Sequence, residues 1–392
     1  MKARQIRPRI YSLPAVDWDR RLFDALIPLP DGTSYNAYLV QGSEKVALID
    51  TADPTMTEAL MSYLQDHPII DYVIANHAEQ DHSGSLPLVL EKYPNAKVVA
   101  TPKCKDLLMT LLLIPEDRFI TVDDGQTLSL GDKTLEFIYA PWVHWPETML
   151  TYVREDRILF PCDLFGSHLA TTDMYVTNER QVYEAAKRYY AEIMMPFHTN
   201  IEKHLERLRS YEIDVIAPSH GPMYDRPPFI LEAYRSWVSG PLKNTVALPY
   251  ISMHGSTQKM VQHLVGALAD RGVTARQFDL TATDTGKLAM ALVDCATLVI
   301  GTPTVLAGPH PNAAHAAFLV NALRPRLQFV SVIGSYGWGG RTVEQLTAMI
   351  PILKVEVLAP VICKGLPRDT DFKALDTLAD TIAAKHKERG FA

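Results

Sequence analysis

The chain has 392 residues, of which 47% are hydrophobic and 21% are charged, and its formal net charge is −7. This length exceeds one ordinary core and predicts two domains, while the excess of acidic residues argues against a nucleic-acid binder, which normally carries a basic face. No apolar run approaches the roughly 18–20 residues of a membrane span. The N-terminus lacks a signal-peptide core, and the four scattered cysteines form no Cys-x-x-Cys pair, so we expect a cytoplasmic protein without a disulfide framework.

The first half of the chain mixes short strands with helices. The expected strands are bounded by Gly, Pro or Asp, and most end in a polar residue. A helix is expected after Pro54, and a long one over residues 179–195. This pattern indicates a sandwich of sheets covered by helices, for which we predict the bounds 1–245. The expected strands cover residues 35–40, 45–51, 71–77, 96–102, 134–141, 149–156, 157–163 and 213–220.

The second half, residues 246–392, alternates strands and helices with short connections. Such alternation predicts a doubly wound parallel sheet. The expected strands cover residues 245–251, 274–280, 296–304, 327–335 and 354–360. The expected helices cover residues 257–271, 286–294, 311–323, 342–350 and 371–388.

The stretch NHAEQDHSGS, which begins at Asn76, places four potential metal ligands within six residues. His77, Glu79 and Asp81 alternate along the chain, so on an extended backbone their side chains point to one side. His82 is their immediate neighbour. Carboxylates beside imidazoles in a tight loop at the end of a strand have few structural uses, so the cluster predicts a metal site.

Three further polar residues follow later strands of the first half, namely His144, Asp163 and His220. Taken singly, such a residue is more often a turn former or a hydrogen-bonded surface group than a metal ligand. If these strand ends converge at one sheet edge, four imidazoles and three carboxylates meet there, which are too many for one tetrahedral ion. The set suits two ions bridged by a carboxylate, and Asp163 is the preferred bridge.

The segment YISMHGSTQKM, which begins at Tyr250, follows a strand and opens a helix. Hydroxyls and backbone N–H groups at a helix N-terminus form a phosphate site. No lysine follows the glycine, which argues against an ATP loop. A loop rich in Ser and Thr suits a flavin monophosphate, and the alternative is an ordinary helix cap.

Two more loops follow the third and fourth strands of the second half. A doubly wound sheet binds its ligand at this carboxyl edge, and aromatic side chains between glycines can flank a planar ring. The three loops together therefore predict an FMN site. Its predicted contacts are Ser252, Met253, His254, Gly255, Ser256, Thr257, Pro303, Thr304, Val305, Gly308, Ser335, Tyr336, Gly337, Trp338, Gly339 and Gly340.

The spacing from His77 to His82 resembles the metallo-β-lactamase superfamily, whose hydrolases carry a histidine at the position of Glu79. The glutamate, with the later motifs HWPETM, CDLFG and SHGPMY, is similar to the flavodiiron proteins. Residues 246–392 resemble flavodoxin, so the match to this family spans the chain. The resemblance implies an α/β protein with an N-terminal metallo-β-lactamase-like αβ/βα sandwich and a C-terminal flavodoxin-like doubly wound parallel sheet.

The same resemblance assigns two irons to the seven side chains. A carboxylate in place of an imidazole hardens the site and favours iron over zinc. By this assignment one iron takes His77, Glu79 and His144, the other takes Asp81, His82 and His220, and Asp163 bridges them.

Three positions vary within the family. Some relatives leave the histidine at the position of His82 off the metal. Several carry a histidine where this chain has Asp24, and such a histidine beside the metals supplies a proton or steers the substrate. His168 is a candidate replacement, and the alternative for Asp24 is a loop carboxylate that makes a turn hydrogen bond.

A flavin and two irons on one chain imply an oxidoreductase that reduces O₂ to water, NO to N₂O, or both. The resemblance further implies a separate electron donor, either a rubredoxin-like protein or a reduced deazaflavin. It also implies a head-to-tail homodimer or a dimer of such dimers. The alternatives are a dizinc hydrolase fused to a flavodoxin-like domain, and an electron-transfer flavoprotein with a degenerate first domain.

Overall fold

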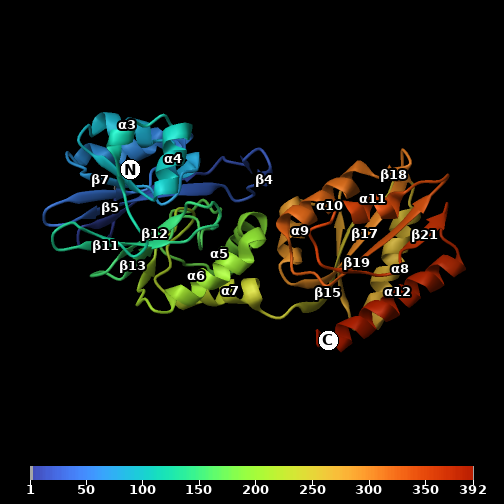
Figure 1. Cartoon of the computed structure of the whole chain (residues 1–392). Helices are drawn as coiled ribbons and strands as arrows, with labels where there is room; N and C mark the ends of the chain where they lie inside the picture. The colour runs from blue at the N-terminus through green and yellow to red at the C-terminus, as the bar shows by residue number, and fades with distance from the viewer. Residues whose placement is uncertain (1–2, 392) are drawn as a thin grey trace. The chain divides into compact units, whose positions relative to one another are not determined.

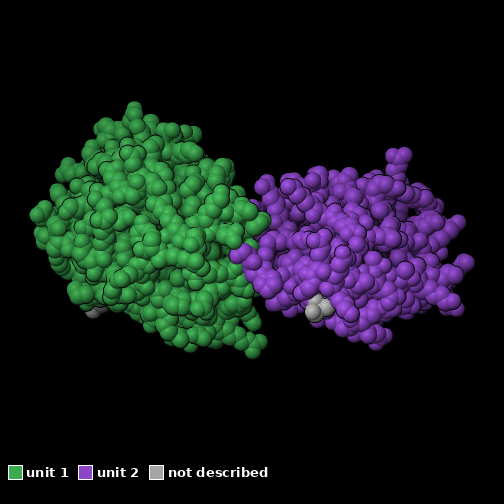
Figure 2. All heavy atoms as spheres, turned by 60° about the horizontal axis from the view of Figure 1, so that its bottom comes forward, with its two compact units in different colours: residues 1–190, 197–238 green, residues 191–196, 239–392 purple. Residues whose placement is uncertain are grey.

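The computed structural model describes residues 3–391, which divide into two compact units (Figure 2). The first unit runs to Tyr190 and resumes over Phe197–Val238, while the second contains Ala191–Pro196 and the residues from Ser239 onward. The change at Ser239 precedes the predicted start of the second domain by a few residues. Within residues 3–391, no helix is both long and apolar enough to cross a membrane.

The first unit contains a seven-stranded sheet in the order β1-β2-β5-β6-β7-β8-β9. The strands from β1 to β6 pair antiparallel, and those from β6 to β9 pair parallel. Parallel neighbours need crossover connections, which contain helices α1 to α4 here. The bounds are β1 Arg4–Arg7, β2 Ile10–Asp17, β5 Thr33–Gln41, β6 Val46–Ile49, β7 Tyr72–Ile74, β8 Lys97–Ala100, β9 Phe119–Thr121, α1 Thr57–Tyr63, α2 Gln80–Ser83, α3 Leu86–Lys92 and α4 Pro102–Leu111.

A second, five-stranded sheet has the order β10-β11-β12-β13-β14. Helices α3 and α4 lie over the first sheet, and α5, α6 and α7 lie beside the second, as Figure 1 shows. This arrangement confirms the predicted sandwich. The bounds are β10 Thr127–Ser129, β11 Thr134–Tyr139, β12 Met149–Val153, β13 Ile158–Phe160, β14 Val215–Ile216, α5 Glu179–Tyr189, α6 His198–Leu208 and α7 Pro227–Ser239.

The sandwich is held together by apolar side chains that alternate along the strands. Tyr38 and Ile49 from the first sheet pack with Phe137 and Phe160 from the second in one buried cluster. The opposite face of the first sheet buries its own apolar side chains, such as Leu48, against the helices. Burial on both faces fixes the register of the central strands, since a shift of one residue exchanges the faces. The polar strand ends are thereby held at the edge of the sandwich.

The second unit contains a parallel sheet in the order β16-β15-β17-β19-β20, with β21 also paired to β19. Helices α8 and α12 share one core on one face, and α9, α10 and α11 lie over the other face (Figure 1). The bounds are β15 Lys243–Tyr250, β16 Thr274–Asp279, β17 Cys295–Val305, β18 Gly308–Pro309, β19 Phe329–Tyr336, β20 Glu356–Val357, β21 Val361–Lys364, α8 Ser256–Asp270, α9 Thr285–Leu292, α10 Pro311–Leu323, α11 Thr342–Ala348 and α12 Asp369–Glu388.

The predicted fifth strand, at residues 354–360, differs from the structure. Only Glu356–Val357 form β20, and the pairing with β19 resumes at β21, which lies after the predicted segment. Pro360 stands between the two pieces. Because a proline has no backbone N–H for the ladder, it interrupts the edge strand there.

One buried histidine ties α12 to this sheet. His386 Nδ1 donates to Asn244 Oδ1 at 2.8 Å, and His386 Nε2 accepts from the Thr297 hydroxyl at 2.6 Å. The amide nitrogen of Asn244 donates to the carbonyl of Gly272, which leaves its oxygen to accept from the imidazole. Burial lowers the pKa of His386 to about 4. The imidazole is therefore neutral in the folded chain at neutral pH.

The low pKa of His386 in the folded chain predicts that the protein loses stability in mild acid. Its pKa is about 4 when folded and about 6.5 when unfolded, so the unfolded chain binds a proton first as the pH falls. The stabilisation is complete above pH 6.5 and is lost between pH 6.5 and 4, by about 1–3 kcal/mol. Calorimetry at pH 7.5, 6 and 5 should show this loss in the wild type and a shallower pH dependence in His386→Asn. Equal pH dependence in both proteins would contradict the expectation.

Candidate metal centre and flavin edge

The predicted metal cluster begins at the carboxyl end of β7. His77 and Glu79 lie in the loop after the strand, whereas Asp81 and His82 lie in the single helical turn α2. The expectation that Glu79 and Asp81 alternate along one extended backbone is therefore wrong. The turn forms because the backbone N–H groups of His82 and Ser83 both donate to the carbonyl of Glu79. It places the consecutive side chains of Asp81 and His82 in one group of possible ligands.

The other three predicted ligands come from the second sheet. His144 lies in the loop between β11 and β12, Asp163 follows β13, and His220 follows β14. All three side chains join those of the first loop in groups of possible ligands, and a further group joins Cys162 to His82 and Asp163. The expected convergence of strand ends is therefore found in the structure.

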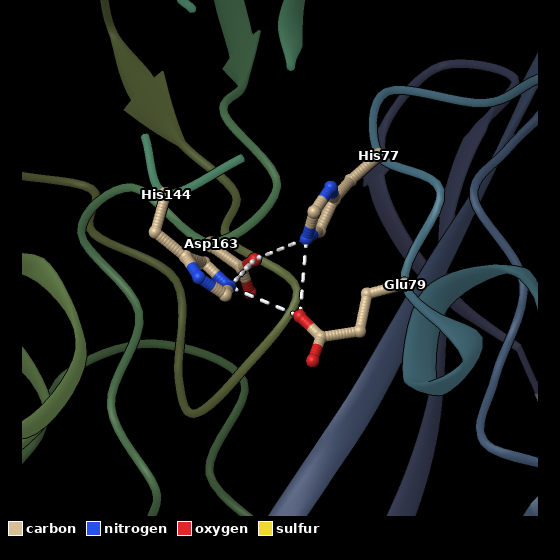
Figure 3. Close-up of side chains that lie close together, drawn as sticks. All are labelled: His77, Glu79, His144 and Asp163. Atoms are coloured by element: carbon tan, nitrogen blue, oxygen red, sulfur yellow. Dashed lines mark hydrogen bonds and ion pairs between the residues drawn. The ribbon is translucent and has the colours of Figure 1, made fainter. Parts of the chain in front are cut away.

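The first group contains His77, Glu79, His144 and Asp163, whose polar atoms point toward a common centre in Figure 3. Oε2 of Glu79 is 3.1 Å from Nε2 of His77 and 3.0 Å from Nε2 of His144. Oδ2 of Asp163 is 3.5 Å from the same two nitrogen atoms.

The second group contains Asp81, His82 and His220. Oδ2 of Asp81 is 3.2 Å from Nε2 of both histidines. Oδ1 of Asp163 is 2.9 Å from Nε2 of His82 and 3.2 Å from Nε2 of His220. Asp163 therefore directs one carboxylate oxygen to each group.

These distances fit two bound cations. Ligand atoms about 2.1 Å from one ion stand about 3.0–3.4 Å apart, which matches the spacings within each group. Several buried atoms also lack hydrogen-bond partners in the described chain, including both oxygens of Asp81, Oδ2 of Asp163 and Nε2 of His82. Buried polar atoms without partners are costly, and a cation in each group would satisfy them.

The pKa values of the side chains in the cluster show that it stabilises positive charge. Burial lowers the pKa of His77, but hydrogen bonds to Glu147 and Glu79 raise it to about 10. Burial likewise lowers the pKa of His220, but hydrogen bonds to Asp163 and Asp81 outweigh burial and raise it to about 9. Burial raises the pKa of Asp163, but the charge of His82 holds it well below its usual range. Metal ions replace such protons when they bind.

Three contacts that orient the ligands were not predicted from the sequence. Nδ1 of His77 donates to Glu147 at 2.7 Å, and Nδ1 of His220 donates to the carbonyl of Ser34 at 2.8 Å. The hydroxyl of Tyr189 donates to Oδ1 of Asp163 at 2.8 Å. The sequence hinted at Glu147, because this residue stands inside the HWPETM motif. Nothing in the sequence indicates the contacts of His220 with Ser34 or of Tyr189 with Asp163.

Asp24 and His168 both lie near the cluster. Asp24 is at the tip of a hairpin formed by β3 (Leu22–Phe23) and β4 (Ile27–Pro28), and its pKa is raised by burial and by the charges of Glu79 and Asp81. His168 is buried, its Nδ1 is 2.9 Å from the Thr33 hydroxyl, and its ring lies 4.9 Å from that of His220. Neither belongs to a group of possible ligands.

The three predicted flavin loops leave neighbouring parallel strands. Tyr250 of β15 pairs with Gly301 of β17, and Pro303 of β17 pairs with Ser335 of β19. The hydroxyls of Thr257 and Ser335 are 3.3 Å apart and link the first loop to the third. The loops therefore meet at one edge of the sheet, as predicted.

The first loop has the geometry of an anion site. Oγ of Ser252 accepts from the backbone N–H groups of Gly255 and Gln258, each at 3.2 Å. Gly255 has a φ of +85° and immediately precedes α8, a conformation that favours glycine. The turn thus leads directly into the N-terminus of α8, where backbone N–H groups would stabilise a phosphate.

The other two loops contribute to an open pocket of about 430 Å³, which the start of α11, Pro360 and Ile362 also line. Four of the predicted flavin contacts line it, namely Thr304, Tyr336, Gly339 and Gly340, whereas the phosphate loop does not. Trp338 is 72% exposed beside them, and an exposed aromatic side chain next to a glycine-rich loop fits a ring-stacking role. The remaining predicted contacts lie in the three loops or at the ends of the helix and strands beside them: Met253, His254, Ser256, Val305, Gly308 and Gly337.

The chain is similar to several known proteins in sequence and in structure. A family model described as ODP family beta lactamase matches residues 33–221. The nitric oxide reductase of Moorella thermoacetica is 33% identical over 388 residues, covering 96% of this chain and 97% of that protein. The solved structure of rubredoxin oxygen:oxidoreductase from Desulfovibrio gigas matches with a TM-score of 0.96 and 28% identity over 100% of both chains. The flavodiiron protein of Giardia intestinalis matches with a TM-score of 0.92 and 27% identity, covering 99% of this chain and 98% of that one.

A metallo-β-lactamase-like sandwich with ligands for two metals, followed by a flavodoxin-like sheet, defines a redox protein with two kinds of cofactor. The chain belongs to the flavodiiron family of oxidoreductases. The predicted resemblance is therefore confirmed, and the predicted cofactors, FMN and two irons, are those of this family. Because the relatives are named as oxidoreductases, the alternative of a dizinc hydrolase is not favoured.

Proposed function

We propose that this chain reduces O₂ to water, NO to N₂O, or both, at a diiron centre that receives electrons through FMN. The position of Asp163 carries the proposal, since its two oxygens face two separate groups of ligands. A carboxylate in that position suits two like cations a few ångströms apart. The carboxylate of Glu79 in the first group favours a hard redox ion over zinc.

The proposed ligands are those expected from the sequence. One iron is held by His77, Glu79 and His144, and the other by Asp81, His82 and His220, with Asp163 between them. The assignment of His82 is supported by its Nε2, which lies 2.9 Å from Asp163 and has no hydrogen-bond partner in the described chain. Asp24 and His168 are proposed to shape the surroundings of the metals without binding them.

The exposure of the ligand side chains indicates from which side a gas would reach the metals. When bound, ferrous irons supply electrons to a diatomic molecule and polarise it. The side chains of His144 and Glu79 are 16% and 12% exposed, whereas those of His82 and His220 are 1% exposed. The most exposed proposed ligands, His144 and Glu79, therefore belong to the first group, and the ligands of the second group are buried.

The test is to reduce the purified protein anaerobically and mix it with O₂ or with NO in a stopped-flow spectrometer. The expected result is rapid reoxidation of the flavin by at least one gas, in protein that contains about two irons per chain by elemental analysis. A full complement of two zincs, with hydrolase activity and no reaction with either gas, would overturn the proposal.

The flavin edge gives a second expectation. The protein should release FMN and not FAD, because the first loop offers one phosphate site and lacks a Gly-x-Gly-x-x-Gly pattern. Replacing Ser256 and Thr257 together with aspartate should empty the flavin site by charge repulsion while iron remains bound. Thr381→Ala on α12 is the matched control and should keep both cofactors. Recovery of FAD from native protein, or flavin retained by the double variant, would count against this site.

The remaining features of the proposal are the domain bounds, the electron donor, the oligomeric state and the location of the protein. We propose residues 1–245 as the diiron domain and residues 246–392 as the FMN domain. Electrons come from an external donor, either a rubredoxin-like protein or a reduced deazaflavin, and a related protein is named for rubredoxin. The working unit is a head-to-tail homodimer or a pair of such dimers, located in the cytoplasm.

A further inference from the structure

The two groups of proposed ligands have the same composition. Each contains two imidazoles and one carboxylate of its own, and Asp163 directs one oxygen to each group. Two irons held by these side chains alone would meet nearly equal charge. A difference in charge around the two irons would therefore come from groups that contact the ligands from outside.

One buried carboxylate outside the seven makes such a contact. Glu147 is 2% exposed, and its Oε1 accepts from Nδ1 of His77 at 2.7 Å and from the backbone N–H of Ala78 at 3.0 Å. Its other oxygen, Oε2, has no hydrogen-bond partner in the described part of the chain. The carboxylate is thus aimed at His77, and no other side chain neutralises it.

This contact fixes the orientation of the imidazole. With the proton of His77 on Nδ1, the lone pair of Nε2 points toward Glu79 and Asp163, which lie 3.1 and 3.5 Å away. A carboxylate behind a ligating histidine sets the tautomer and increases the basicity of the ring. Trp145 supports the same orientation, because its ring meets the His77 ring edge-on at 5.0 Å.

Among the residues that the structure describes, no ligand of the second group bonds an outside carboxylate in this way, and the side chain of Cys162 lies beside His82. His220 donates its Nδ1–H to the carbonyl oxygen of Ser34, a neutral acceptor that makes a weaker hydrogen bond than a carboxylate. Asp50 is a second buried carboxylate nearby, but it accepts from the backbone and amide nitrogens of Asn76 and not from a ligand. Within residues 3–391, the first group alone therefore has a ligand that is hydrogen-bonded to an outside carboxylate.

We propose that Glu147 is a positioning residue that makes the two irons inequivalent, because it holds His77 toward the metal and favours the ferric state of the iron in the first group. With iron in both groups, a one-electron mediator would take its electron first from the iron held by His77, Glu79 and His144. The ferrous–ferric form would then have its charge localised in the first group. The inference rests on the proposed function, since it requires iron in both groups.

The test is a redox titration of the intact iron-loaded protein, followed by electron paramagnetic resonance of the ferrous–ferric form. Glu147→Gln keeps an oxygen that can accept from His77 and Ala78 but removes the charge. The constant for forming the ferrous–ferric species from the two end states is expected to fall by about tenfold, because a charged acceptor is replaced by a neutral one. Thr101→Val is the matched control, since the Thr101 hydroxyl donates to the backbone carbonyl of Glu147 and accepts from the backbone N–H of Cys104. This substitution disturbs the surroundings of Glu147 without changing its charge, so it should leave the titration unchanged.

The outcomes separate this inference from the proposed function. Absence of iron from the wild type would refute the function, whereas two irons with the same titration in wild type and Glu147→Gln would refute only the role of Glu147. If Glu147→Gln loses iron, Glu147→Asp decides the matter. Iron retained in the aspartate variant supports a role for the charge, and loss of both iron and FMN from both variants would show that Glu147 serves folding instead.

Discussion

Replacing Asp163 with asparagine is expected to remove most of the iron and, with it, gas reduction. The carboxylate directs one oxygen to each group of ligands, at 2.9 Å from His82 and 3.5 Å from His144. An asparagine would offer one neutral oxygen to one group and would turn N–H donors toward the other. Since loss of a residue that merely supports a ligand typically weakens metal binding by about 10–100-fold, loss of a shared ligand should exceed that range. Elemental analysis after dialysis and the stopped-flow assay measure both effects.

The control for this variant is the removal of a carboxylate that faces solvent. Asp214 is exposed and pairs with Arg157 at 2.8 Å, so Asp214→Asn should keep two irons and full activity. Both proteins should keep FMN, which reports that the second unit is folded. Two irons and undiminished gas reduction in Asp163→Asn would show that the bridge is wrongly assigned.

Much of the site could be predicted because its residues lie at the ends of apolar strands. Strands are recognisable from short apolar runs, and the carboxyl ends of neighbouring strands meet at one edge, so His144, Asp163 and His220 could be placed with the cluster after β7. The same argument placed the three flavin loops together, because their strands are adjacent and parallel. Glu79 then distinguished an iron site from a zinc site by the chemistry of one donor.

What the sequence could not predict depends on local backbone hydrogen bonds and on contacts between distant residues. The turn α2 changes the direction of Asp81 and His82, and it depends on local hydrogen bonds to the carbonyl of Glu79 that no alternation of residue types reveals. The hydrogen bond from Tyr189 to Asp163 joins residues that are 26 positions apart. Strand β2 was missed as well, because Pro14 interrupts its run of apolar residues, although its register with β5 is continuous.

The second large expected effect is the recovery of gas reduction in a mixed dimer, and it depends on whether electrons pass between chains. Electron tunnelling weakens steeply with distance, so a flavin and the irons that it serves must lie close together. The family resemblance implies that FMN of one chain serves the irons of its partner in a head-to-tail dimer. A two-fold interface of this kind is self-complementary and closes after two chains. Two variants that are inactive alone should therefore restore activity when they form a mixed dimer.

In the first variant His144 and Asp163 are replaced by alanine, and FMN is kept. In the second, Ser256 and Thr257 are replaced by aspartate, and iron is kept. A mixed dimer contains one intact flavin–iron pair only if electrons cross between chains, because within each chain one cofactor is missing. Random mixing after dissociation should return about a quarter of the wild-type rate, since half of the dimers are mixed and each has one working pair of two. Native mass spectrometry verifies that mixed dimers form, and verified mixed dimers that stay inactive would show that electrons pass within a single chain.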